Sequence, residues 1–231
     1  MGADTCRTGA AVPVASVFLR SRQVGTACVT MLACGLMVAL GGDLNLPVPG
    51  AEVPIVVGTL APLVQAWAVL SCADGDYRWI ETVTPRSLAH PRMLLLGVLS
   101  LVAVALVFTS AWLAMGSGTA LALVCSFWIL AGLGTVGWVA GGRVPSLALP
   151  LVFTLTCISF GSGSGDGGAA RWALLLVEPG APEALAAAAL GMLVAVSGWW
   201  TRDRIPPGPW HRLRDRSYPR PRSRLVQRGS R

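Results

Sequence analysis

Cysteine and histidine are the residue types in this chain that could bind a metal ion or form disulfide bonds. No two of the six cysteines form a CxxC pair, and most of them lie inside apolar stretches, where cysteine behaves as a small apolar side chain. The two histidines, His90 and His211, lie in arginine-rich polar segments. We therefore predict no metal site, no cofactor and no disulfide framework. The cysteines are Cys6, Cys28, Cys34, Cys72, Cys125 and Cys157.

Motifs for bond-breaking chemistry are missing from the sequence. There is no GxxxxGK[ST] phosphate loop, and the chain has no lysine to complete one. Neither HExxH nor GxSxG occurs, and no pair of carboxylates lies in a plausible pocket. We predict no catalytic residue and no enzymatic activity, so any work that the protein does draws its energy from a partner.

Gln65 is the most polar side chain in the middle of an apolar stretch, where no Asp, Glu, Arg or His occurs. Ion-coupled transporters usually need ionisable groups at such positions. Two interpretations remain open for Gln65. It lines an internal polar path, or it forms a hydrogen bond with a neighbouring helix, and the second is the more frequent role of such a residue.

The composition identifies the environment that these residues occupy. Of the 231 residues, 54% are hydrophobic and 13% are charged, and the mean hydropathy is +0.63. Soluble domains carry about 25% charged residues, so most of this chain is expected to contact lipid. The fold class that we predict is all-α, a polytopic membrane protein with six transmembrane helices.

Six apolar stretches of about 18 to 23 residues support that prediction, because each is long enough for a helix to cross the hydrocarbon core. Backbone groups in lipid must be bonded within the segment, which requires helices. The fifth stretch contains Pro145 and Pro150, so we expect a kink near its inner end. The stretches are Val24–Gly42, Val53–Cys72, Met93–Met115, Thr119–Gly141, Val144–Gly161 and Glu183–Trp200.

The arginines predict the orientation of these six helices. With the N-terminus inside, 17 of the 18 arginines lie on the cytoplasmic side, and only Arg171 lies outside. We therefore expect a multi-pass protein of the cell (inner) membrane with both termini in the cytoplasm. Aromatic side chains near the ends of the stretches are expected in the headgroup zone. These are Trp112, Trp138, Trp199 and Trp200, whereas Trp67 and Trp128 are expected to pack between helices.

The chain divides into three parts: residues 1–23, a transmembrane domain at 24–200 and a tail at 201–231. In the first part, Val14–Gln23 fits either an amphipathic helix on the inner membrane surface or an ordinary basic flank. The Arg/Pro-rich tail is expected to be disordered. Its arginines should bind anionic lipid, at roughly 1 kcal/mol each, rather than nucleic acid. The proposed lipid-binding residues are Arg212, Arg214, Arg216, Arg220, Arg222 and Arg224.

The longest inner loop, Ala73–Arg92, mixes both signs of charge with apolar side chains such as Trp79 and Ile80. A connection of this length fits a docking surface for a cytoplasmic partner, and a solvated loop with an interfacial anchor fits equally well. The loop contains the sequence ETVTPRS at Glu81–Ser87.

This layout resembles the membrane (permease) subunits of ABC transporters of the second exporter type. In that family a Glu followed by Thr-Pro often occurs in the cytoplasmic coupling segment between the second and third spans, as in Glu81–Ser87. Val14–Gln23 and Ala170–Val177 are similar in position to the family's interface helix and outer hairpin. The resemblance implies a subunit that forms a homo- or heterodimer and pairs with a separate cytoplasmic ATPase. It also implies that Glu81, Thr84 and Pro85 are coupling residues. The long tail and the short fifth stretch depart from the family's pattern.

Three functions are compatible with the sequence. The first is a membrane-spanning subunit of an ATP-driven transporter, energised by a separate ATPase subunit. The second is a non-transporting integral membrane protein, such as an anchor, an assembly factor or a regulator, which the scarcity of polar residues within the spans favours. The third is a membrane enzyme acting on lipid, against which the missing catalytic pairs count.

Overall fold

The computed structural model describes residues 22–42, 44–46, 55–73, 89–161 and 181–201, together with residues 19 and 175. Apart from one short strand pair, the elements in these ranges are helical, which confirms the predicted all-α class for this part of the chain. The α-helices are α2 (Val24–Gly41), α3 (Ala61–Ser71), α5 (Ala89–Met115), α6 (Ser117–Gly141), α7 (Arg143–Phe160) and α8 (Pro182–Thr201). Five of them, all except α3, are long and apolar enough to cross a membrane.

The second predicted span is wrong in its first residues. The stretch Val53–Cys72 was expected to be one helix, but Ile55–Val56 form strand β2, and a 3-10 helix, η1 (Val57–Leu60), then leads into α3. Strand β2 pairs antiparallel with β1 (Asn45–Leu46). The β-branched pair Ile55-Val56 favours an extended backbone, and Pro62 suits the first turn of a helix. The resulting apolar helix, Val57–Ser71, is shorter than the other five.

The remaining helices follow the predicted stretches closely. α5 begins at Ala89, four residues before the predicted start, and therefore includes Arg92. The connection between the third and fourth helices is shorter than the three residues between the predicted stretches, because Gly116 alone separates α5 from α6. Its φ of 90° lies in the region that glycine adopts at little cost. α7 continues as one helix through Pro150.

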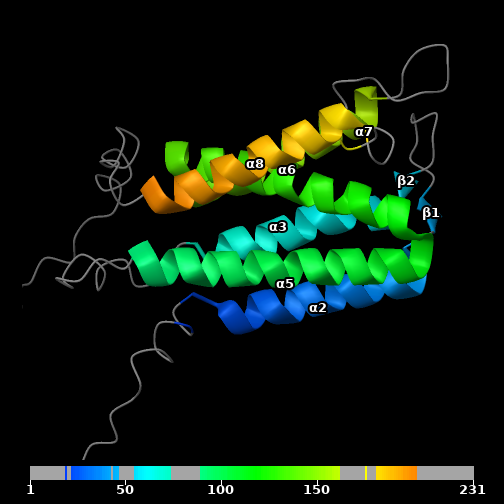
Figure 1. Ribbon diagram of the computed structural model, residues 1–231, viewed down its shortest axis with the longest axis horizontal. Coiled ribbons are helices and arrows are strands. Elements are labelled where there is room, and N and C mark those ends of the chain that lie inside the picture. The colour runs from blue at the N-terminus through cyan, green and yellow to red at the C-terminus, as the bar shows by residue number, and fades with distance from the viewer. Residues whose placement is uncertain are drawn as a thin grey trace, which may run out of the picture.

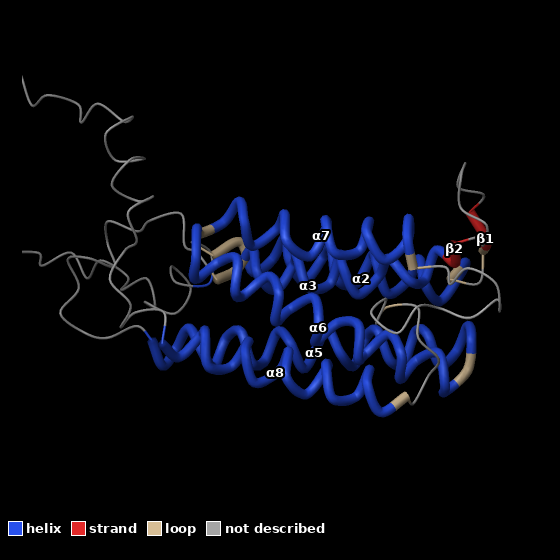
Figure 2. The backbone as a smooth tube through the Cα atoms, turned by 90° about the horizontal axis from the view of Figure 1, so that it is seen from above, coloured by secondary structure: helices blue, strands red, loops and turns tan. Residues whose placement is uncertain are grey.

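The helices form a bundle in which α3 and α6 are central (Figure 1). α3 packs against α2, α5, α6 and α7, while α6 packs against α3, α5, α7 and α8. A second view shows the same long helices side by side along the bundle axis (Figure 2). Within its most apolar window, α6 is 67% buried, compared with 22% for each of α2, α7 and α8. The outer helices therefore surround two inner ones.

Glycines allow α6 and α8 to approach closely. A Cβ atom added to Gly132 of α6 would lie 2.7 Å from the Cα atom of Gly191 in α8. A Cβ atom on Gly191 would in turn clash with the carbonyl oxygen of Trp128. The buried face of α8 continues this pattern of small residues with Ala184, Ala188 and Ala195. Small residues at helix crossings are typical of membrane bundles, where close backbone packing replaces the hydrophobic effect.

The outward faces of the bundle are apolar. Large aliphatic and aromatic side chains are exposed along α2, α5, α7 and α8, and Leu40, Leu113 and Val144 are each more than 75% exposed. A water-soluble monomer rarely exposes contiguous apolar surface of this extent. Examples on each helix are Leu32, Leu36, Met37, Leu94, Leu101, Phe108, Val152, Leu155, Leu190 and Leu193. This surface is compatible with a multi-pass membrane protein.

Candidate functional site

Arg22 is buried at one end of the bundle, just before α2. Its side chain is only 1% exposed, and its Nη1 atom donates hydrogen bonds to the carbonyl oxygens of Cys72 (3.2 Å) and Ala73 (2.6 Å). Cys72 is the C-cap of α3, whose last carbonyls lack intrahelical donors. The guanidinium supplies donors at the negative end of the helix dipole. Arg22 therefore fixes the start of α2 to the end of α3.

Arg92, in the first turn of α5, is also buried at this end. It is 6% exposed, and its Cζ atom lies 6.0 Å from the centre of the Trp138 ring near the end of α6. A guanidinium at this distance over an indole makes a cation–π interaction. Arg92 therefore connects the beginning of α5 to the end of α6.

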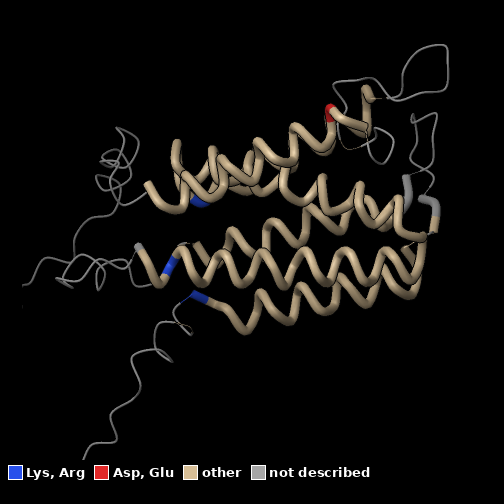
Figure 3. The backbone as a smooth tube through the Cα atoms, viewed as in Figure 1, with Lys and Arg blue, Asp and Glu red and all other residues tan. Residues whose placement is uncertain are grey.

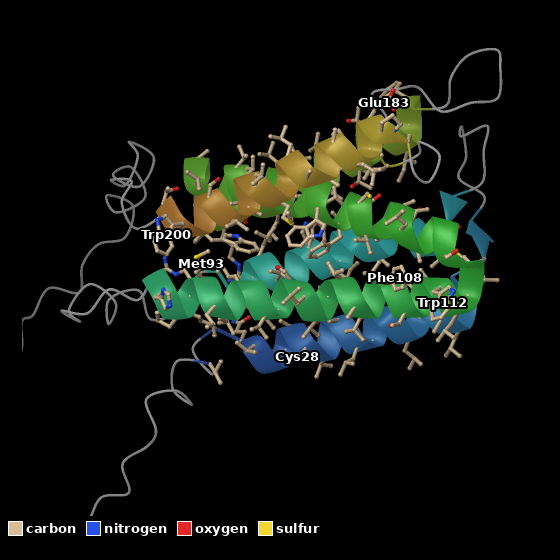
Figure 4. All side chains as sticks on the ribbon, in the orientation of Figure 1. Cys28, Met93, Phe108, Trp112, Glu183 and Trp200 are labelled. Atoms are coloured by element: carbon tan, nitrogen blue, oxygen red, sulfur yellow. The ribbon has the colours of Figure 1, made fainter. Side chains whose placement is uncertain are left out.

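The charged residues of the described ranges are divided between the two ends of the bundle. Arg22, Arg92 and the exposed Arg143 lie at the end where α2, α5 and α7 begin (Figure 3). Glu183, in the first turn of α8, lies at the opposite end (Figure 4). We call the first of these the arginine end. The described chain also enters the bundle here, at Arg22, and leaves it here, at Thr201 (Figure 1).

The connection that holds the predicted coupling residues joins two points at the arginine end. Ala73, held by Arg22, precedes it, and Ala89, the first residue of α5, follows it. Glu81, Thr84 and Pro85 themselves lie outside the described residues, as do the tail arginines 212, 214, 216, 220, 222 and 224. Their roles in coupling and lipid binding stay predictions.

Gln65 lies between two helices. Its side chain is completely buried, and Nε2 donates a hydrogen bond of 3.0 Å to the carbonyl oxygen of Met31 in α2. Its Oε1 atom has no hydrogen-bond partner among the described residues. The structure thus has the interhelical hydrogen bond of the second interpretation. The internal polar path stays a prediction.

The four tryptophans near helix ends comprise two exposed and two buried side chains. Trp112 and Trp200 are 57% and 42% exposed (Figure 4). Trp138 and Trp199 are buried in the bundle, and a position of the four in the headgroup zone stays a prediction. Trp138 is covered because Arg92 lies over its ring. In α8, Trp199 continues the buried face of Ala188 and Ala195.

Trp67 packs between helices, as predicted. Its Nε1 atom donates a hydrogen bond of 3.1 Å to the carbonyl oxygen of Leu147 in α7. Neither this bond nor the burial of Arg22 and Arg92 follows from the sequence pattern. The nearest signal in the sequence was Pro150, because a proline within a helix disturbs the backbone hydrogen bonds of the preceding turn, in which Leu147 lies.

The described ranges contain no group of three or more His, Cys, Asp or Glu placed to hold a metal ion. Comparison with known proteins gives no relative: no protein-family model, no curated protein and no solved structure matches the chain. Any assignment of function therefore rests on the geometry of the bundle and on the sequence.

Proposed function

We propose that the chain crosses a membrane six times. The five long helices make five crossings, and η1 together with α3 makes the remaining one, which is the second along the chain. Their 15 residues, Val57–Ser71, reach roughly 22–25 Å, less than the ~30 Å of a hydrocarbon core. This is tolerable because α3 is surrounded by α2, α5, α6 and α7 rather than by lipid. A short helix inside a bundle need not match the bilayer when protein groups bond its ends. Arg22 does so at one end, and the β1–β2 pair lies at the other.

The arginine end faces the cytoplasm in this proposal. Positively charged residues next to membrane helices are retained on the cytoplasmic side, and the three described arginines share one end. The chain enters the bundle at Arg22 and leaves it at Thr201, and both points lie at this end too (Figure 1). Residues 1–21 and the tail would therefore be cytoplasmic, in the cell (inner) membrane orientation expected from the sequence.

Within this topology, the protein acts as the membrane subunit of an ATP-driven transporter, paired with a separate cytoplasmic ATPase. The observation that carries the proposal is that Ala73 and Ala89 both lie at the arginine end. The sequence between them, residues 74–88, contains Glu81, Thr84 and Pro85 of the ABC-like coupling sequence. An ATPase docked there would act directly on the end of α3. The subunit would function as a homo- or heterodimer.

Co-purification tests this function. The full-length protein would be purified in mild detergent from its own cells, with Glu81→Gln and Pro85→Ala variants alongside. We expect an ATPase subunit with the wild type and about tenfold less with the variants, equivalent to ~1.4 kcal/mol of binding energy. Glu183→Gln is the matched control, because it removes the same charge at the opposite end of the bundle. Recovery without an ATPase, under conditions that preserve a known transporter of this type, would contradict the proposal.

A second function, a non-transporting membrane anchor, assembly factor or regulator, is favoured by the packing of the interior. Gln65 is fully buried, and α6 and α8 touch at Gly132 and Gly191. An anchor of this kind needs a tightly packed bundle and no polar route through it. The same purification distinguishes the two functions, because an anchor, assembly factor or regulator would be recovered with a partner that has no ATPase activity.

A further inference from the structure

Side chains at four positions attach α3, or its C-terminal cap, to neighbouring helices. Toward α2, Arg22 donates to the carbonyls of Cys72 and Ala73, and Gln65 donates to that of Met31. In the reverse direction, the thiol of Cys34 in α2 lies 3.8 Å from the carbonyl oxygen of Ala61, as a weak donor. Toward α7, Trp67 donates to Leu147. The shortest α-helix of the described bundle is thus bonded on two sides.

The bonds to α2 run along the whole length of α3. Arg22 holds the arginine end, Gln65 the middle and Cys34 the beginning of the helix. Beyond that, backbone hydrogen bonds join Val57 to Leu44 (3.0 Å) and Gly58 to Gly42 (3.1 Å). Two helices connected at both ends and in the middle move together, because any relative shift breaks several bonds in a low-dielectric interior. α2 and η1–α3 therefore form one rigid pair.

The bond to α7 lies in the turn before Pro150, where the helix lacks one backbone hydrogen bond. Pro150 has no N–H, so the carbonyl of Ser146, four residues earlier, has no helical donor. The neighbouring carbonyl, that of Leu147, accepts the Trp67 hydrogen bond. This turn of α7 also packs on α6, since a Cβ atom added to Gly134 would lie 3.0 Å from the Ser146 oxygen. A prolyl turn is a position where a helix bends readily.

We propose that α3 transmits movement from the arginine end to the prolyl turn of α7, with Arg22, Gln65 and Trp67 as the positioning residues. A displacement of Ala73, where the 74–88 connection begins, would move the α2–α3 pair as one body. Trp67 would then pull on Leu147 and bend α7 at Pro150. The partner that displaces Ala73 is the ATPase of the proposed function, on which this inference rests. The mechanical linkage itself can be tested without that partner.

Hydrogen–deuterium exchange of the full-length protein in lipid nanodiscs tests the linkage. Trp67→Phe removes the bond to α7 and keeps an aromatic ring, and we expect the amides of residues 147–149 and 151 to exchange about fivefold faster. Arg22→Gln breaks the attachment at the far end of α3, and we expect faster exchange at these same α7 amides as well as at residues 69–73. Trp112→Phe is the control, because Trp112 is 57% exposed on α5, and it should change neither region.

The linkage is contradicted if Arg22→Gln speeds exchange only beside Ala73, or if Trp67→Phe leaves the exchange of residues 147–149 and 151 unchanged. Should Arg22→Gln fail to fold, Gln65→Met loosens the same pair and replaces it in the comparison. Pro150→Ala provides an independent check, because it restores the missing donor and should slow exchange in this turn of α7. None of these measurements involves an ATPase, so this inference and the proposed function can fail separately.

Discussion

The Nη1 atom of Arg22 lies 2.6 Å from the carbonyl oxygen of Ala73, so a cation from the N-terminal flank closes the end of α3. The two residues are 51 positions apart, and both lie at the arginine end. This contact brings Arg22, just before α2, and Ala73, just after α3, to one location.

Replacing Arg22 with Gln should destabilise the bundle by about 1.5–3 kcal/mol, the usual worth of a hydrogen bond to a charged group. The loss should appear as a lower Tm in detergent, read from tryptophan fluorescence. Arg143→Gln is the matched control, because Arg143 is exposed at the same end and its loss should leave Tm almost unchanged. Equal losses for the two variants would mean that net charge, not the Arg22 contact, sets the stability.

Gln65→Met should change the free energy of unfolding by less than about 1.5 kcal/mol. The variant loses the bond to Met31, worth ~0.6–1.7 kcal/mol in a membrane bundle, but it also removes a buried amide oxygen that has no partner in the described ranges. A variant that stays folded, loses transport and yet leaves hydrogen exchange in the prolyl turn of α7 at the wild-type rate would identify Gln65 as part of a polar path rather than of the linkage. Unchanged transport would leave it with the structural role.

Gly132→Ala should separate α6 from α8, because its Cβ atom would meet the Gly191 backbone at 2.7–2.8 Å, which no side-chain rotation relieves. We expect a loss of about 1–3 kcal/mol, typical of overpacking. Gly97→Ala in α5 is the control, since nothing lies within 4 Å of its added Cβ atom. Alanine there should stabilise the helix by roughly 0.5–1 kcal/mol. A stable Gly132→Ala protein would show that the crossing is looser than described.

Arg92→Leu and Trp138→Leu should be coupled in a double-mutant cycle. A partly desolvated cation–π pair contributes about 0.5–2 kcal/mol, so the double variant should lose that much less than the sum of the two single losses. Chemical denaturation in mixed micelles measures the three free energies. Additive losses would show that Arg92 and Trp138 act independently.

Most helix boundaries could be predicted from the sequence, because long apolar stretches end at arginines or glycines. The starts of α2 and α7 and the end of α6 match the prediction to within one residue. Strand β2 and helix η1 could not be predicted, since a hydropathy pattern does not distinguish an apolar strand from an apolar helix. The length of the apolar stretch Val53–Cys72 did not reveal that α3 is short. A short helix is acceptable there because other helices surround it, and hydropathy carries no information on that packing.

The buried arginines were beyond prediction for a different reason. In sequence, Arg22 and Arg92 resemble any basic flank of a membrane helix, and burial depends on partners 50 and 46 residues away, at Cys72 and Trp138. The Trp67–Leu147 bond likewise joins residues 80 positions apart. Hydropathy and charge locate elements along the chain, but they carry no information on which helices are neighbours.

The topology is the central claim, and reporter fusions test it most directly. A reporter active only in the cytoplasm would be attached after Ser230, and one active only outside would be inserted near Gly165 in the intact chain. The six-span arrangement predicts activity from both fusion proteins and none when the reporters are exchanged. Activity of the exchanged pair would place the arginine end outside and contradict the six-span arrangement with both termini in the cytoplasm.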